Sequence, residues 1–502
     1  MKKIILLTLA FIFAFTTPAY ATRTNHYSYT WGIWGVEHTV PGFQVARVID
    51  SSHMPVPLER VDDVAVGGGR VFIADSSAGR VNVLCAYDYH FITSIRLIRD
   101  SDNRIVIIEE TNEQLMLAGP EGVFFSEHSN RLYIADTAAE RIVILDGDYL
   151  QLIDIITRPD DMMGFTAFRP ARLVVDVSGR ITFMVHGTFE GLGVLEADGS
   201  FVRWFGTTQP TMSFIDYLWR SIATREQRAQ MALTFAPAFT GIDIDPDGFL
   251  MAVTADASST YRIFRFNARG DNVIRSEGSW PLIGDSTMGF HLDSTPSQFV
   301  NIAVTDFGVY AVVDRTRGRV FVYDFDGYLI TVFGQLGDGR GDFRDPSGIA
   351  WNGYDILVGD RAMGVLNVFT PTRFGEVALA ANQAYHEGRW DEANDLFRQA
   401  VALNSTFYSA YSGLGRNLLM QRRYAEALYY FYTGFDLEGY SRAWAGRRGE
   451  IIETFFVPIA IAVVALAALV IVSEAKHLKK ARHQDGEITI TTKKKGKEAA
   501  KP

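Results

Sequence analysis

An apolar hairpin that recurs along most of the chain is the feature that most constrains the fold. "RLYIADTAAERIVILD" occupies residues 131–146, and "RVFIADSSAGRVNVLCAYD" from Arg70 and "VYAVVDRTRGRVFVYDFDG" from Val309 repeat its pattern. A four-stranded antiparallel sheet cannot bury both faces by itself, whereas sheets packed in a ring bury each face against a neighbour. Aligning the hairpins gives six units, in which the second run ends at Asp75, Asp136, Val185 or His186, Asp256, Asp314 and Asp360. The sequence therefore predicts a six-bladed β-propeller.

Tight-turn signals support the strand assignment. "DVSGR" at 176–180, "DPDGF" at 245–249 and "DFDGY" at 324–328 place Gly after an acidic or small residue between two apolar runs. Such clusters favour hairpin turns. "DIDPDG" at 243–248 also imitates the start of a calcium loop, but position twelve would be Thr254 and not Glu. We interpret it as a turn with Gly248 in the left-handed region.

A ring of sheets must also be closed, because an open blade would leave an unpaired edge strand. "GFQVARVID" at residues 42–50 lies upstream of the first complete unit. We predict that this segment supplies the strand that completes the last blade.

The hairpin motif resembles the NHL repeat over about residues 40–372. The resemblance implies a TolB-like six-bladed propeller. Arg80, Arg141 and Arg319 follow their aspartates by five residues, as in the motif, whereas Val365 stands at that position in unit six. The Asp and Arg positions recur around the ring, while an active site is needed only once. We therefore interpret them as structural, with the carboxylate accepting amide hydrogen bonds in the turn and the Arg pairing nearby.

Unit three departs from the motif and is followed by an insertion. Residues 213–232, "SFIDYLWRSIATREQRAQMA", have apolar residues at helical spacing, which predicts one or two amphipathic helices. These helices are either a lid on one propeller face or a docking element. We predict partner contacts in this region at His186, Phe189, Trp219, Arg225 and Arg228.

After residue 372 the period changes from 2 to 3.6, and a second repeat begins. A small/large pattern at Ala381, Trp390, Ala393, Phe397 and Ala400 returns 34 residues later at Gly415, Tyr424, Ala427, Phe431 and Gly434. This is the period of the tetratricopeptide (TPR) repeat. A TPR groove typically binds peptides, and we predict partner contacts at Asn382, Tyr385, Arg416 and Asn417. We also expect a capping helix near Arg442 that runs towards the membrane segment, with a kink at Pro458.

Both ends of the chain carry targeting signals. Residues 1–21 combine two lysines, an apolar stretch and "AYA", the pattern of a cleaved signal peptide. Residues 454–472 are apolar and uncharged over nearly the length of a membrane-spanning helix. Nine basic and three acidic residues follow from Lys476 onwards, so the positive-inside rule places the tail in the cytoplasm. We expect a single-pass protein of the cytoplasmic membrane with its main body outside the cytoplasm.

The predicted organisation is thus an all-β propeller, an all-α TPR domain and one transmembrane helix. Its parts are a signal peptide at 1–21, a segment with the closing strand at 22–50, the propeller at 51–372, TPR repeats with a capping helix at 374–448, the membrane helix at 451–473 and a basic tail at 474–502. The net charge is −10, and without the signal lysines and the tail it is about −18. Such an acidic body disfavours nucleic-acid binding.

Few residues indicate catalysis. The histidines do not recur at one position of the repeat, as a metal triad on the propeller axis would require, and no phosphate-binding loop or nucleophile elbow is present. Asp63, Glu121 and Asp345 either line the channel mouth or only satisfy loop amides. Cys85 is the only cysteine, so an intrachain disulfide is impossible. We expect it to be a buried small hydrophobe, with a reactive thiol as the alternative.

The sequence therefore predicts a membrane-anchored extracytoplasmic scaffold, similar to bacterial membrane-anchored NHL/TPR proteins. It would bind a protein or peptide partner, such as a membrane or cell-envelope complex, through the propeller face and the TPR groove. We expect no catalytic residues, no cofactor and no metal. The alternatives are a metal-dependent enzyme similar to propeller lactonases and lyases, and a glycan-binding module that uses Trp31, Trp34 and Trp351.

Overall fold

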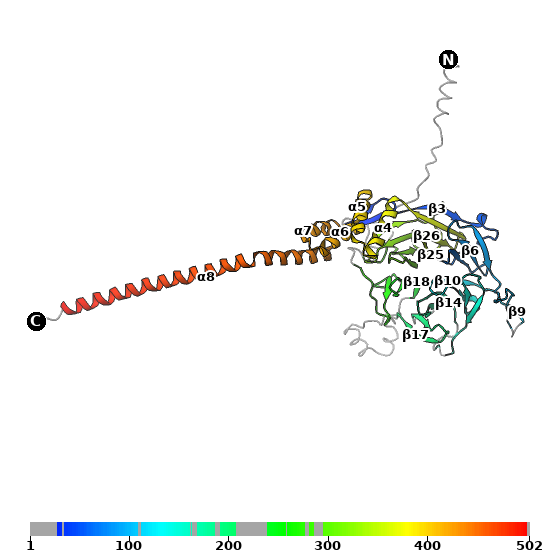
Figure 1. Cartoon of the computed structure of the whole chain (residues 1–502), viewed down its shortest axis with the longest axis horizontal. Coiled ribbons are helices and arrows are strands. Elements are labelled where there is room, and N and C mark those ends of the chain that lie inside the picture. Colours follow the sequence, from blue (N-terminus) through cyan, green and yellow to red (C-terminus); the bar gives the residue numbers. More distant parts are fainter. Residues whose placement is uncertain are drawn as a thin grey trace, which may run out of the picture. The chain divides into compact units, whose positions relative to one another are not determined.

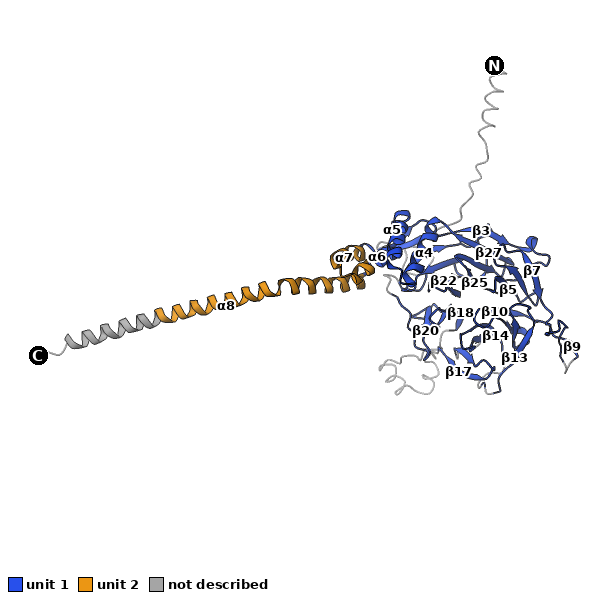
Figure 2. Cartoon of the chain, in the orientation of Figure 1, with its two compact units in different colours: residues 1–414, 433–436 blue, residues 415–432, 437–502 orange. Residues whose placement is uncertain are grey.

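The computed structural model describes residues 28–498, except 33–34, 109–111, 161, 163–167, 186–190, 207–237, 258, 277–280 and 286–294. The predicted signal peptide and the helical insertion lie outside the described residues. The chain divides into two compact units (Figure 2). One unit comprises residues 1–414 and 433–436, and the other comprises residues 415–432 and 437–502.

Six antiparallel sheets form the β-propeller (Figure 1). The first three blades follow one another along the chain. Blade one contains β4 (Asp63–Gly67), β5 (Arg70–Asp75), β6 (Arg80–Cys85) and β7 (Phe91–Ile95); blade two contains β10 (Pro120–Ser126), β11 (Arg131–Asp136), β12 (Arg141–Asp146) and β13 (Leu152–Ile156); blade three contains β14 (Pro170–Val175), β15 (Ile181–Val185), β16 (Leu192–Leu195) and β17 (Phe201–Phe205).

The last three blades complete the ring. Blade four has three strands among the described residues, and blade six takes its fourth strand from the N-terminal part of the chain. Blade four contains β18 (Phe239–Ile244), β19 (Leu250–Thr254) and β20 (Ile263–Phe266); blade five contains β21 (Phe299–Val304), β22 (Tyr310–Asp314), β23 (Arg319–Tyr323) and β24 (Leu329–Phe333); blade six contains β25 (Pro346–Asn352), β26 (Asp355–Asp360), β27 (Val365–Pro371) and β3 (Phe43–Ile49).

The predicted ring closure is confirmed. β3 pairs antiparallel with β27, and the register runs from Ile49 opposite Leu366 to Phe43 opposite Pro371. The inner strands β4, β10, β14, β18, β21 and β25 contact one another in cyclic order, and β25 contacts β4 again. The ring is therefore closed between blade six and blade one.

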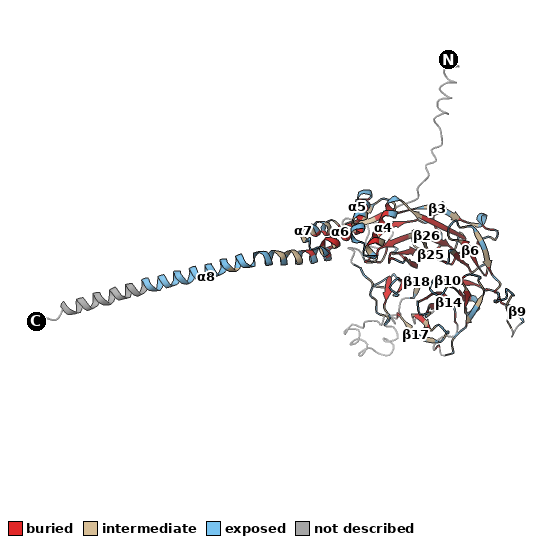
Figure 3. Ribbon diagram, in the orientation of Figure 1, coloured by how far each residue is buried: buried red, intermediate tan, exposed pale blue. Residues whose placement is uncertain are grey.

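The apolar runs are continuous because each blade packs between two others. Strand β11, for example, is buried from Leu132 to Asp136, and β22 is buried from Tyr310 to Asp314. A strand buried on both faces does not need the alternation of a half-exposed strand. Separate apolar clusters fill the spaces between adjacent blades, and one of them joins Leu366 of blade six to Val71 of blade one. Figure 3 shows this burial across the inner strands.

Two short hairpins accompany the ring. β1 (Tyr29–Gly32) pairs with β2 (Gly35–His38), and β8 (Ile107–Ile108) pairs with β9 (Glu113–Gln114). The short helices η1 (Ser51–His53) and η2 (Thr137–Ala139) lie in connections. The buried Tyr29 hydroxyl of β1 donates to Asp285 at 2.6 Å, which ties the first hairpin to the propeller.

Five helices follow the propeller in the part of the chain that the structure describes. They are α4 (Arg373–His386), α5 (Trp390–Leu403), α6 (Tyr408–Met420), α7 (Tyr424–Thr433) and α8 (Leu437–Glu498). The switch to helix occurs where the sequence period changes. However, α4 belongs to the same compact unit as the propeller, because Thr372 NH donates to Gly42 at 2.9 Å and Tyr354 donates to Gln383 at 2.5 Å.

The small/large pattern marks helix contacts. Ala381, Ala393 and Phe397 are buried, and a Cβ on Gly415 would lie 2.8 Å from the Phe431 ring. The helices thus approach closely at the small residues.

Helix α8 continues without a break through Pro458, in agreement with the expected continuation of the capping helix. Its part from Leu437 to Lys480 contains a stretch that is long and apolar enough to cross a membrane. Phe456 and Leu466, both in this stretch, are more than half exposed.

Candidate functional site

The six inner strands surround a central channel, and one position of the repeat alternates around it. At this position blades one, three and five carry Asp63, Arg172 and Asn301, whereas blades two, four and six carry glycine. The glycines are Gly122, Gly241 and Gly348.

Close packing explains the alternation. A Cβ on Gly122 would lie 2.9 Å from Cα of Arg172, one on Gly241 would lie 2.4 Å from Cα of Asn301, and one on Gly348 would lie 2.6 Å from Cα of Asp63. Each glycine therefore makes room for the backbone that presents the next polar side chain. The result is three polar groups from alternate blades at one level of the channel.

The Asp63 side chain contacts both of the others. The Asp63 carboxylate lies 3.5 Å from Nη1 of Arg172 and accepts a hydrogen bond from Nδ2 of Asn301 at 3.1 Å. The Asp63 carboxylate also accepts a hydrogen bond from the Val123 amide of blade two at 3.3 Å. In addition, Nη2 of Arg172 donates to the Asp62 carbonyl at 3.2 Å. The cluster therefore links blades one, two, three and five inside the channel.

Burial dominates the electrostatics of the cluster. Desolvation raises the pKa of Asp63 above its usual value, although Arg172 and the Val123 amide oppose this rise. Desolvation likewise lowers the pKa of Arg172, and the Asp63 charge opposes that change. Each charge thus offsets part of the other's cost of burial.

Asp243 is a second carboxyl group in the channel. It lies on β18, two residues beyond Gly241, and lines the same cavity of about 160 Å³ as Asp63 and Arg172. Burial raises its pKa to about 7, even though its carboxyl group accepts hydrogen bonds from the amides of Val304 and Ile244. A carboxyl group with this pKa exchanges its proton near neutral pH.

A larger cavity of about 330 Å³ opens where the inner strands begin. Its charged lining consists of Arg172, Arg315, Arg361 and Glu121. Gln298, Thr240 and apolar side chains such as Phe239 and Met184 complete the described lining. We call this cavity the arginine-lined mouth.

Aspartates behind the cavity hold two of its arginines. Nε of Arg315 lies 2.8 Å from Asp345, and Nε of Arg361 donates to Asp62 at 2.8 Å. Both pairs use Nε, so these carboxylates leave the terminal nitrogens of each guanidinium for other contacts. Arg60 also donates to Asp62, at 2.8 Å.

The candidates at the channel mouth have different roles. The sequence left two roles open for Asp63, lining the channel or accepting backbone amides. Asp63 has both roles, because it lines the channel and accepts the Val123 amide. Glu121 lines the arginine-lined mouth, and Asp345 orients Arg315. Arg172, Asp243, Asn301, Arg315 and Arg361 were missed. An alignment of the six inner strands, rather than of the hairpins, would have shown the alternation of polar residues and glycine.

The structural interpretation of the repeated aspartates is confirmed where they end the second strand. The Asp136 carboxylate accepts from the amides of Ala118 and Gly119 at 3.0 and 2.9 Å, and Arg141 lies 2.8 Å from it. The pairing of Arg80 with Asp75 is longer, at 3.7 Å. The equivalent aspartates of blades five and six accept amides in the same way, from Gln298 and Thr316 in one blade and from Arg344, Asp345 and Met363 in the other.

Two details differ from the expectation. In blade four the position opposite the start of the inner strand belongs to Thr254, not Asp256, because β19 ends two residues earlier. At this position the Thr254 hydroxyl donates to the Ala238 carbonyl at 2.8 Å and accepts the Asp256 amide at 3.1 Å. In blade five, the Arg319 guanidinium pairs with Asp285 and donates to the Tyr29 hydroxyl.

The predicted partner contacts in the propeller are not placed by the structure. His186, Phe189, Trp219, Arg225 and Arg228 all lie outside the described residues.

The predicted contacts in the helices are placed, and they remain predictions. On α4, Asn382 is buried and donates to Ala378 at 2.9 Å, while the Tyr385 ring packs against Trp390. On α6, Asn417 is buried and accepts from Gln421 at 3.0 Å, and Arg416 is half-buried.

Three further expectations can be compared with the structure. Gly248 has a positive φ of 81°, as expected for a turn, and the Asp245 carboxylate accepts the amides of that turn. Trp351 donates to the Ala303 carbonyl at 3.0 Å in the ring, and Trp34 lies outside the described residues. Cys85 is partly exposed and not buried, because it ends β6 at a hairpin turn.

No family model and no curated protein matches the chain. Solved structures with a similar fold include hydrazine synthase of Kuenenia stuttgartiensis, with 12% identity, coverage of 64% of this chain and 98% of that chain, and a TM-score of 0.38. A streptogramin B lyase has 13% identity, 66% and 98% coverage and a TM-score of 0.38. Virginiamycin B lyase from Staphylococcus aureus has 12% identity, 69% and 95% coverage and a TM-score of 0.38. At these identities and TM-scores the likeness carries no argument about activity.

Proposed function

We propose that this protein is a membrane-anchored binding protein whose arginine-lined mouth holds an acidic side chain or terminal carboxylate of a protein or peptide partner. The observation that carries the proposal is the convergence of Arg172, Arg315 and Arg361 on one open cavity. A guanidinium presents several N–H donors in a fork that matches a carboxylate. The aspartates behind Arg315 and Arg361 fix these side chains before a partner arrives, which lowers the entropy cost of binding.

The surroundings of the cavity favour a peptide over a simple anion. Glu121 adds an acceptor to the lining, and Phe239, Met184 and Val300 add apolar surface. A peptide segment can use all three kinds of contact, whereas an inorganic anion would use only the arginines. The acidic body of the protein would also repel a free anion more than a segment of mixed charge.

The anchor and the location outside the cytoplasm remain part of this proposal. The apolar stretch of α8 supports an anchor, and the basic residues after it support a cytoplasmic tail. The 34-residue helical pattern supports a TPR-like second binding surface. The partner would then be a protein of the membrane or cell envelope.

Site-specific photo-crosslinking in the native membrane tests the proposal. A photoreactive residue at the exposed Gln298 position reports on the arginine-lined mouth. The same residue at the exposed Ser178, in the turn after β14, reports on the opposite end of the channel. We expect one dominant crosslinked partner from position 298 and not from position 178.

Charge variants then test the recognition mechanism. Arg315→Gln should reduce the crosslink from position 298 at least fivefold, because it removes one of the three guanidiniums. Arg180→Gln is the matched control, since Arg180 pairs with Glu196 at the surface of blade three and lies outside the cavity. Equal crosslinking from both positions, or an equal effect of both arginine variants, would show that the proposal is wrong.

A second candidate, an enzyme acting inside the channel, is supported by Asp243, whose pKa of about 7 suits proton transfer. The metal-dependent version fits the donor set poorly, because Asp63 already contacts the guanidinium of Arg172 and the amide of Asn301. Equilibrium dialysis of the full chain with Ca²⁺ tests this version. One bound ion per chain that Asp243→Asn removes would favour the enzyme.

A further inference from the structure

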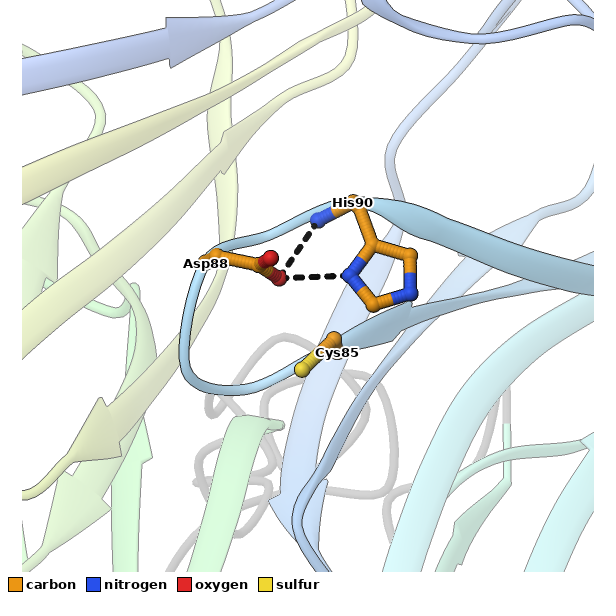
Figure 4. Close-up of side chains that lie close together, drawn as sticks. All are labelled: Cys85, Asp88 and His90. Carbon is orange, nitrogen blue, oxygen red and sulfur yellow. Dashed lines mark hydrogen bonds and ion pairs between the residues drawn. The ribbon is translucent and has the colours of Figure 1, made fainter.

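The hairpin turn between β6 and β7 in blade one brings three different metal-binding side chains together (Figure 4). Cys85 and His90 face each other across the turn, where the Cys85 amide donates to the His90 carbonyl at 2.9 Å. Residues paired in this way present their side chains on one face of the hairpin. Asp88 lies within the turn between them.

The Asp88 carboxylate points at the imidazole. Its Oδ1 lies 2.6 Å from Nδ1 of His90 and accepts the His90 amide at 3.2 Å. One ligand atom from each of Cys85, Asp88 and His90 lies within 4.8 Å of the others. Among the described residues this is the one group of three or more such side chains.

We propose that Cys85, Asp88 and His90 bind one Zn²⁺ ion, with water in the fourth position. Thiolate, imidazole and carboxylate are the ligands that Zn²⁺ takes from proteins, and three protein ligands with one open position are a common arrangement. The thiolate favours Zn²⁺ over the hard cations Ca²⁺ and Mg²⁺. Binding releases the thiol proton of Cys85 to solvent as the sulfur–metal bond forms.

The geometry needs little adjustment for this ion. Two ligand atoms of one tetrahedral Zn²⁺ lie about 3.5 Å apart, given metal–ligand distances of about 2.0–2.3 Å. The side chains of Asp88 and His90 are 54% and 61% exposed, so they can rotate by the small amount required. The ion can also enter from solvent without opening the blade.

Arg47 contacts the backbone of this turn, and this contact leaves the Asp88 carboxylate to His90. Its guanidinium donates to the backbone carbonyl of Asp88 and lies 5.8 Å from the centre of the Tyr89 ring. Arg47 belongs to β3, the strand that closes the ring, and Tyr89 donates to Asp355 of blade six at 3.2 Å. The turn therefore lies at the seam between the last and first blades.

Cobalt spectroscopy on the full chain, purified in detergent and stripped of metal, tests the site. Co²⁺ bound to a thiolate gives a sulfur-to-metal charge-transfer band in the near ultraviolet, and Cys85 is the only cysteine in the chain. We expect one Co²⁺ per chain with this band, and its displacement by one equivalent of Zn²⁺. We also expect Zn²⁺ to raise the unfolding temperature, because it binds the folded state.

Single variants assign the ligands. Cys85→Ser should abolish the band, and His90→Gln and Asp88→Asn should each weaken Zn²⁺ binding at least tenfold. His53→Gln is the matched control. His53 and Asp50 form another exposed histidine–aspartate pair, at 2.9 Å, and this pair is not part of the cluster that contains Cys85. Circular dichroism checks that each variant is folded. Absence of the band in the folded wild-type chain, or equal weakening by His53→Gln and His90→Gln, would overturn the proposal.

Discussion

Asp360 gives the sharpest test of the structural role assigned to the repeated aspartates. Its carboxylate is fully buried at the end of β26, and it accepts three backbone amides without an arginine at the motif position. Oδ2 accepts from Arg344 and Asp345 at 2.7 and 3.0 Å, and Oδ1 accepts from Met363 at 2.8 Å. Replacing Asp360 with Ala removes the acceptor and leaves these amides unpaired.

The expected loss follows from those three bonds. A hydrogen bond to a charged group contributes about 1.5–3 kcal/mol, and bonds to one acceptor are not additive. We therefore expect Asp360→Ala to lower the free energy of unfolding by about 4 kcal/mol. For a propeller of about 330 residues, from Phe43 to Pro371, this corresponds to a fall in Tm of about 6 °C.

Thermal unfolding of the full chain, followed by near-ultraviolet circular dichroism, measures this effect. Asp176→Ala is the matched control, because the Asp176 carboxylate also accepts three hydrogen bonds, from Ser178 and Arg180, but in a surface turn. Water can replace that acceptor, so we expect a fall of less than about 2 °C. Equal Tm values for the two variants would refute the reasoning, since burial would then not matter.

Two further variants test the channel. The raised pKa of Asp243 means that the unfolded chain loses this proton near pH 4, whereas the folded chain keeps it until about pH 7. The Asp243 carboxyl group thus destabilises the fold increasingly as pH rises from 4 to 7. At pH 8, Asp243→Asn should raise the free energy of unfolding by about 1–2 kcal/mol, which is less than the full pKa shift implies because channel water reaches the group. At pH 4.5 the same substitution should change the free energy of unfolding very little. Urea unfolding at both pH values checks this, and equal gains would contradict it. Gly122→Ala should cost about 1–3 kcal/mol in the same assay, because its Cβ would lie 2.4 Å from the Ala171 carbonyl. Gly449→Ala is the control, because Gly449 is helical and its Cβ would meet open space beyond the backbone of its own helix; an equal loss there would contradict the packing argument.

The local sequence pattern was sufficient to predict the architecture of the propeller. The strands around Asp75, Asp136, Asp314 and Asp360 end where the hairpin motif predicts, because apolar runs and acidic turns determine them within a few residues. The closing strand was also predictable, since a ring with an unpaired edge is unfavourable.

The local sequence pattern did not predict contacts that depend on residues far apart in the sequence. Blade four places Thr254, and not Asp256, at the end of β19, because the register with β18 decides this position. Arg319 pairs with Asp285 because the first hairpin brings Tyr29 to the same place. Cys85 is partly exposed because it lies at the end of β6, next to a hairpin turn.

The sequence by itself determined the six units, the closing strand, the change to helices near residue 373 and the apolar stretch of α8. These features depend on the periodicity of neighbouring residues, which the chain carries locally. Only the tertiary structure decided the contents of the channel. Asp63, Arg172 and Asn301 are separated by more than 100 residues along the chain, and they meet because ring closure brings alternate blades to one axis. Their contacts, and the pKa shifts of Asp63 and Arg172, depend on that shared burial, which no local pattern records.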